Sequence, residues 1–72
     1  MSSPPSQRWL PSTGEQYFLL LGNGMITRFP WHDTPFDHEA WHFGNCFKTY
    51  AQAKHAREQL KALFRTLHQA HP

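Results

Sequence analysis

The fold of this chain is decided by Gly44-Asn45-Cys46-Phe47-Lys48-Thr49, where an aromatic-rich segment passes into the only long helical pattern. Thr49 is typical of a helix N-cap, because its hydroxyl can accept a hydrogen bond from an early helical N–H. Gln52 completes a Thr-x-x-Gln capping box, in which its side chain is expected to bond the Thr49 amide. Gly44 and Asn45 favour a sharp turn before the cap. The pattern therefore predicts a helix that begins at about residue 50.

Downstream of Thr49, apolar residues recur at the spacing of one helix face. A helix over residues 50–68 carries them as a single stripe. The stripe consists of Ala53, Ala56, Leu60, Leu63, Phe64 and Leu67. Small side chains come first and large ones later. We therefore expect a sheet to approach closely near Ala53 and Ala56, and the large side chains to fill the wider end of the core.

Upstream, two apolar runs at residues 17–21 and 25–29 flank a glycine-rich turn. Asn23-Gly24 favours a two-residue type I′ loop and hence a β-hairpin. This register places four side chains on one face, Phe18, Leu20, Thr27 and Phe29. A different loop length would exchange the faces, because side chains alternate along a strand. Residues 31–39 are expected to form an acidic loop, and residues 41–43 could add a short third strand.

The length of the chain limits it to one small domain. Seventy-two residues support a thin core that contributes only ~3–5 kcal/mol. Residues 1–8 are rich in Ser and Pro and are expected to be a flexible arm. Residues 9–72 are expected to form one α+β domain, an antiparallel hairpin packed against a C-terminal amphipathic helix. Trp9 should fold back onto this domain.

The composition favours the reducing cytoplasm. The single cysteine, Cys46, excludes an internal disulfide. No apolar run approaches the ~18 residues that a membrane span needs, and the first residues lack the pattern of a signal peptide. We therefore expect no membrane partner.

Two spaced motifs belong to a pattern that runs from Trp9 to about Leu67 and also includes Gly24, Ile26, Trp31, Asp37, Ala53 and Leu60. The first is Trp-x-Pro-x-x-Gly-Glu-x-Tyr, formed by Trp9, Pro11, Gly14, Glu15 and Tyr17. The second is Gly-Asn-x-Phe-x-Thr, formed by Gly44, Asn45, Phe47 and Thr49. With these motifs the chain resembles a family of short proteins found mainly in phages and prophages. Ala51 and Gln52 stand where that family usually has paired glutamates.

The resemblance implies a small non-enzymatic protein that binds and modulates a host macromolecule. Phage proteins of this kind commonly act on host machinery, including defence systems such as CRISPR complexes. The expected partner is thus a host protein or protein complex. The aromatic content exceeds what one helix can hide, which favours an exposed contact surface next to the acidic loop. The predicted contact residues are Trp31, Phe36, Asp37 and Trp41.

The helix leaves two other partners open. One is nucleic acid, whose phosphates could be bound by Lys54, Arg57, Lys61 and Arg65. Glu58 interrupts this stripe and is expected to pair with Lys54 and Lys61, and a net charge of +2 is mild for such a role. The other is a second copy of the chain, packed on an uncharged helix face. That face consists of Ala51, His55, Gln59, Ala62 and Thr66.

The histidines suggest a metal site, which we weigh against an ordinary surface. His38, His42 and Cys46 recur every four residues and are suitable zinc ligands. However, Pro35 and Gly44 argue against a helix through this region, and no Cys-x-x-Cys pair is present. Cys46 and His42 also lack an orienting third group for nucleophilic catalysis. We therefore predict no metal, no cofactor and no enzymatic activity.

Overall fold

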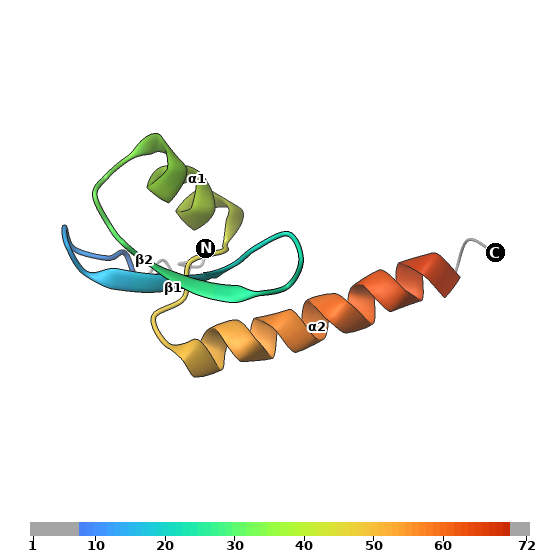
Figure 1. Cartoon of the computed structure of the whole chain (residues 1–72). Coiled ribbons are helices and arrows are strands. Elements are labelled where there is room, and N and C mark those ends of the chain that lie inside the picture. Colours follow the sequence, from blue (N-terminus) through green and yellow to red (C-terminus); the bar gives the residue numbers. More distant parts are fainter. Residues whose placement is uncertain (1–7, 70–72) are drawn as a thin grey trace, which may run out of the picture.

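The computed structural model describes residues 8–69 as two strands followed by two helices, with the strands lying between the helices (Figure 1). Strands β1 (Gln16–Leu20) and β2 (Ile26–Pro30) form an antiparallel hairpin. Helix α1 (Pro35–Phe43) covers one face, and the first half of helix α2 (Tyr50–Gln69) lies against the other. The expected α+β class, a hairpin packed against a long C-terminal helix, is confirmed. The third strand is not formed, because residues 41–43 belong to α1.

The hairpin register differs by one residue from the expected one. Tyr17 lies opposite Phe29 and Leu19 opposite Thr27, so these four side chains share the face toward α1. Phe18, Leu20, Ile26 and Arg28 share the face toward α2. The loop contains three residues instead of two: the Leu21 carbonyl accepts from Gly24 N–H at 2.9 Å, and Gly24 has φ +90°. A turn followed by a left-handed glycine adds a residue, which inverts the faces.

Residues 35–43 form a helix where a loop was expected. Thr34 is its N-cap, with its hydroxyl accepting from Asp37 N–H at 3.1 Å and Asp37 bonding the Thr34 amide in return. Pro35 occupies the first helical turn, where its fixed φ is favourable and its missing N–H costs nothing. Gly44 ends the helix with φ +97°. The sequence pattern was thus misinterpreted: Pro35 and Gly44 mark the two ends of this helix.

The core is small and aromatic. Tyr17, Leu19 and Trp31 are buried, and the rings of Tyr17 and Trp31 meet edge to face with centroids 5.8 Å apart. The expected return of Trp9 to the domain is confirmed, since Trp9 packs against this cluster. Its carbonyl accepts a hydrogen bond of 2.8 Å from the Trp41 indole. The expected flexible arm lies outside the described residues except for Arg8, whose guanidinium stacks on the Trp41 ring.

The segment between the helices is bonded to the outer edge of β1. The Asn45 side chain accepts from Leu20 N–H at 2.8 Å and donates to Leu20 C=O at 2.9 Å. Phe47 and Phe18 exchange two backbone hydrogen bonds of 2.8 Å each. The chain therefore crosses from the α1 face of the hairpin to the α2 face while it pairs the outer edge of β1 at Phe18 and Leu20.

Helix α2 begins where the sequence predicts. Thr49 accepts from Gln52 N–H at 3.1 Å, which confirms Thr49 as the N-cap. The reciprocal bond differs from the expected one, because the Gln52 side chain accepts from the amide of Lys48, at 3.1 Å, and not from that of Thr49. Ala53 is fully buried against the strands. The close approach predicted near Ala53 is thus confirmed.

We predict that Asn45→Ala lowers the free energy of unfolding by about 1.5–3 kcal/mol, because two hydrogen bonds to β1 are lost together. Urea unfolding followed by tryptophan fluorescence measures this loss. Gln59→Ala, which removes an exposed amide from α2, is the control and should change stability by less than ~0.5 kcal/mol. Equal effects of the two substitutions would show that Asn45 does not hold the crossing.

Candidate functional site

The second half of α2 extends beyond the hairpin and packs against little of the domain. A helix of 20 residues is about 30 Å long, whereas a strand of five residues is about 17 Å long. All described residues from Glu58 onward are exposed. The expectation that Leu60, Leu63 and Phe64 fill the core is therefore wrong. The two strands are too short to cover them.

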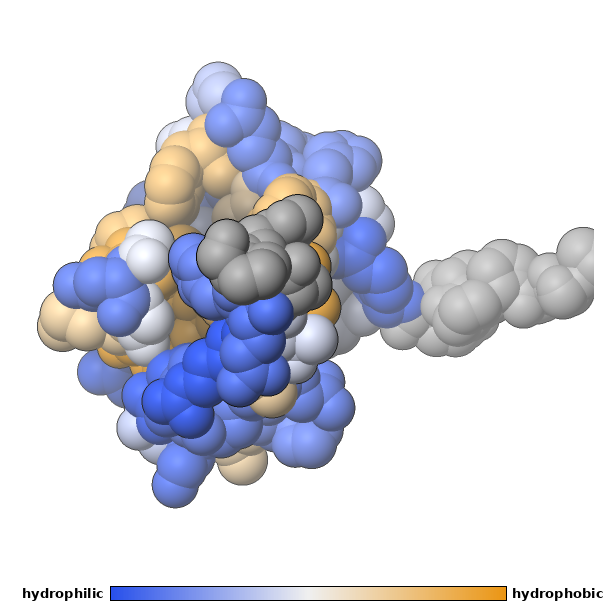
Figure 2. Space-filling view, turned by 90° about the vertical axis from the view of Figure 1, so that its right-hand side faces the viewer, coloured by the Kyte–Doolittle hydropathy of each residue, from blue (hydrophilic) through white to orange (hydrophobic). Residues whose placement is uncertain are grey.

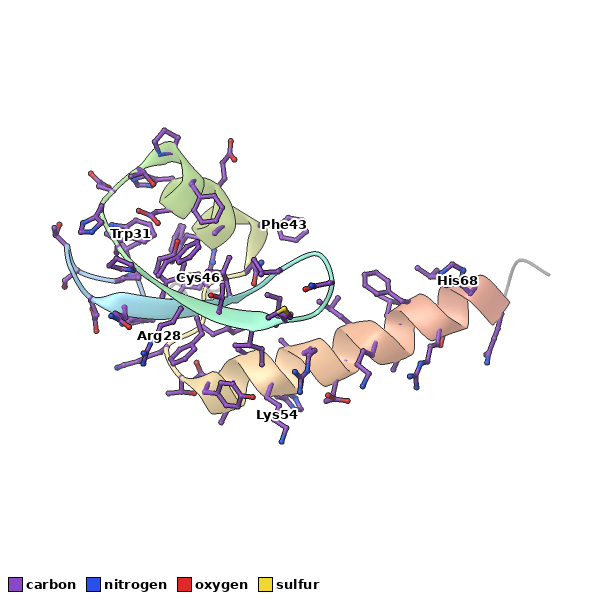
Figure 3. The ribbon with its side chains drawn as sticks, viewed as in Figure 1. Arg28, Trp31, Phe43, Cys46, Lys54 and His68 are labelled. Carbon is purple, nitrogen blue, oxygen red and sulfur yellow. The ribbon has the colours of Figure 1, made fainter. Side chains whose placement is uncertain are left out.

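An open groove of about 820 Å³ lies between this part of α2, the hairpin loop and the end of α1. Its floor includes Ala56 and Leu60, and Leu21 and Gly22 of the hairpin loop form one wall. Phe43 stands at its rim, with 88% of its surface exposed. Figure 3 shows Phe43 pointing outward from α1, away from Trp31 and Cys46, which lie between α1 and the strands.

The surface in and around this groove is strongly apolar. Exposed large side chains come from all three elements: Leu21, Met25, Phe43, Leu60, Leu63, Phe64 and Leu67. Weighted by their exposed fractions, at about 200 Å² per side chain, they present roughly 700 Å². The largest apolar patch of a typical monomer is about 300–600 Å². Figure 2 shows apolar side chains gathered beside the hydrophilic tip of α2. We call these seven residues the apolar surface.

The contact residues predicted from sequence are not brought together at the surface. Trp31 and Asp37 are each only 3% exposed, so neither can meet a partner directly. Trp41 is half-buried against the core. Phe36 is exposed and packs against Phe29 with ring centroids 5.5 Å apart. The prediction treated residues 31–39 as a loop and residues 41–43 as a possible strand, whereas helix α1 turns Asp37 inward.

Asp37 is the buried centre of a polar network. One carboxylate oxygen accepts from the Tyr17 hydroxyl at 2.6 Å, and the other accepts from the N–H groups of His32 and Thr34. Burial alone would raise the pKa of Asp37, but these hydrogen bonds outweigh it and lower the pKa to about 2. Burial, with the bond to Asp37 second, raises the pKa of Tyr17 well above its ordinary value. Perturbed groups often mark active sites. Here both side chains are enclosed, so the network has a structural role.

The basic stripe is partly neutralised within α2. Glu58 pairs with Lys61 and with Arg57, each at 3.3 Å. The expected pairing with Lys61 is confirmed, whereas Arg57 takes the place expected for Lys54. The hydrogen bond from Lys61 and its charge lower the pKa of Glu58. Lys54 and Arg65 remain as exposed cations, and Figure 3 shows Lys54 pointing away from the strands.

The histidines are dispersed. His38 and His42 do share a helix, contrary to the expectation for this region. However, His38 bonds Asp33 at 2.6 Å, while His42 meets the ring of Trp41. Burial raises the pKa of the Cys46 thiol to about 11, which makes it a poor nucleophile at neutral pH. Among residues 8–69, no three His, Cys, Asp or Glu side chains are grouped so that they could hold a metal ion.

The uncharged face of α2 remains exposed along its length. Its residues, Ala51, His55, Gln59, Ala62 and Thr66, are all exposed. Three of them, with Phe47, Gln52 and Ala56, line a shallow depression of about 530 Å³. Small side chains provide little area for a partner, so this face offers less than the apolar surface does.

None of the three comparisons, with protein-family models, with curated protein sequences and with solved structures, finds a match to this chain. In the described part of the chain, neither helix has the length and apolar character that a membrane crossing requires. The apolar surface was missed in the sequence because Leu60, Leu63 and Phe64 were assigned to the core. The signal that could have revealed it was the length of the predicted elements, because strands of five residues cannot cover a helix over residues 50–68.

We predict that Asp37 makes stability fall at low pH. Its lowered pKa means that folding favours the carboxylate, so the contribution is complete above pH ~4 and is lost as pH falls toward ~2. The loss should be about 2–3 kcal/mol in wild type. Asp37→Asn should be less stable than wild type at pH 7 and should lack this part of the pH dependence.

Urea unfolding between pH 2 and 7 measures both effects. Glu39→Gln, which removes an exposed carboxylate from α1, is the matched control and should follow the wild-type curve. If Asp37→Asn instead shows the wild-type slope with pH, the network around Asp37 does not stabilise its charged form.

Proposed function

We infer that this protein is a non-enzymatic interaction module that acts by binding another protein through its groove. The observation that carries this function is the apolar surface, which presents more apolar area than the largest patch of a typical monomer and draws on α1, α2 and the hairpin loop. Apolar side chains around a concave floor are typical of surfaces that receive a helix or loop of a partner. Water-exposed leucines and phenylalanines in this number favour burial by another chain.

The residues that line the groove suit binding better than catalysis. Arg57 and Lys61 are the only charged side chains among the described residues that line it. General acid–base or nucleophilic catalysis most often uses a carboxylate, imidazole or thiolate facing the substrate. The described lining has none of these. The two cations at the rim instead suit a partner that presents apolar residues flanked by acidic ones.

The resemblance to phage and prophage proteins supports a host macromolecule as the partner. A protein of the bacterial defence machinery, such as a CRISPR complex, is the specific proposal. Binding would occur in the bacterial cytoplasm. Phe36, exposed beside Phe29, adds a second apolar contact at the other end of the hairpin.

We predict that a photo-crosslinking residue in the groove captures the partner. Incorporation at Phe64, which is 56% exposed, should yield one specific product in host cells, identified by mass spectrometry. Incorporation at Tyr50, an exposed aromatic at the other end of α2, is the matched control and should yield none.

Binding of the purified partner then provides the quantitative test. Leu63→Glu should weaken it at least tenfold, because a charge is forced into an apolar contact. Ala62→Glu makes the same charge change on the solvated side of α2 and should have less than a threefold effect. Equal effects, or capture from Tyr50 alone, would contradict the proposed function.

Nucleic acid is the alternative partner. It would use Lys54, Arg57, Lys61 and Arg65, all of which α2 displays. The pairing of Glu58 with two of them places this alternative second. DNA or RNA binding at about 50 mM salt that falls steeply as salt rises would favour it.

A further inference from the structure

We propose that, when no other partner is bound, two copies of this chain form a two-fold symmetric dimer in which each α2 lies antiparallel in the groove of the other. The proposal rests on the same premise as the proposed function, namely that the groove receives a protein chain. It identifies that chain, in the free protein, as a second copy of the same protein.

The exposed area matches what a dimer requires. The apolar surface presents roughly 700 Å² per copy, so two copies would bury about 1,400 Å² in total. Stable interfaces bury about 1,200–2,000 Å². A two-fold axis makes the same surface serve on both copies, which an elongated helix with a groove beside it can satisfy.

The printed sequence offers no other cover. The residues outside the described range, 1–7 and 70–72, contain one large apolar side chain, Met1. A single side chain of about 200 Å² cannot replace roughly 700 Å² of contact. The second half of α2 is also too short to be a stable helix alone in water, because isolated helices below ~12–15 residues are marginal. Contact with another chain would stabilise this part of the helix.

The stripe has the spacing of a helix–helix seam. Ala53, Ala56, Leu60, Leu63 and Leu67 follow one another at intervals that alternate between three and four residues. This is the a/d pattern that packs one helix against another. Ala53 is already buried by the hairpin, and the seam from Ala56 to Leu67 is free for a second helix.

The gradient of side-chain size selects the antiparallel arrangement. Ala56, at the floor of the groove, is small, whereas Leu63 and Leu67 are large. Antiparallel packing places Leu67 of one copy opposite Ala56 of the other, and Leu60 opposite Leu63. A large side chain then meets a small one at each end of the seam, and two leucines meet on each side of its middle. Parallel packing would set Ala56 against Ala56 and leave the floor of each groove empty.

The charges of α2 permit this contact. At about 100° per residue, Lys54, Lys61 and Arg65 lie roughly 110–150° from the middle of the stripe. The residues that flank the stripe on one side are neutral, Gln52, Gln59 and Thr66. On the other side Arg57 is held by Glu58. Antiparallel packing sets the flank that carries Arg57 and Lys61 against the same flank of the other copy, and the pairing of both cations with Glu58 reduces their repulsion.

Sedimentation equilibrium of the full chain tests the proposal. Wild type should change from monomer to dimer between about 5 and 500 μM, as expected for an interface of standard size. Leu63→Glu should remain monomeric throughout, and Ala62→Glu should dimerise as wild type does. Near-UV circular dichroism of the Tyr17–Trp31 core should be the same in all three proteins, which shows that each is folded.

Cysteine pairing tests the orientation. In a Cys46→Ala background, Gln59→Cys and Thr66→Cys proteins are mixed and oxidised. Antiparallel helices bring these positions together across the seam, so the mixed disulfide should dominate over both symmetric ones. Predominance of the symmetric disulfides would overturn the antiparallel arrangement.

Different results would contradict the dimer and the proposed function. A wild-type protein that is monomeric at 500 μM would overturn the dimer, while capture of a host protein from Phe64 would still stand. Dimerisation of Leu63→Glu at wild-type strength would also overturn it, because the seam would then not be the interface. A dimer that dissociates in Leu63→Glu, with no loss of host capture, would support the dimer and contradict the proposed function.

Discussion

A hairpin of two short strands can cover only half of a helix as long as α2, and the rest of the structure follows from this mismatch. The first half of α2 is placed on the strands through Ala53, whose lack of a large side chain allows close approach. The second half has the same amphipathic pattern but no strand to cover it. Amphipathic helices gain most of their stability from packing that stripe, so an unpacked half is unfavourable in an isolated monomer.

Polar contacts replace much of the core that the domain lacks. Asn45 joins the helix connection to the edge of β1, and Asp37 joins α1 to Tyr17 and to the loop before it. Asn45 makes two of these bonds and the Asp37 carboxylate accepts three, and their burial or partial burial makes them stronger than the same bonds in water. The domain can thus hold its two helices on opposite faces of a small ribbon. One consequence is that it leaves the groove between α2 and the hairpin loop open.

Local signals in the sequence located α2 and the hairpin but not their relation to each other. Thr49 marked the start of α2 because capping depends on residues close in sequence. The hairpin register was missed because Gly22-Asn23-Gly24 suits both a two-residue and a three-residue loop. Helix α1 was missed because Pro35 was interpreted as a breaker when it begins the helix. The exposed second half of α2 could not be predicted from periodicity, which marks an apolar face without showing what covers it.

We propose that contact with another chain stabilises the second half of α2. Amide hydrogen exchange of residues 60–69 at about 5 μM and about 500 μM tests it most directly, because exchange reports opening segment by segment. We expect protection of these amides to rise with concentration, while protection of β1 stays unchanged. Equal protection of residues 60–69 at both concentrations would contradict the claim.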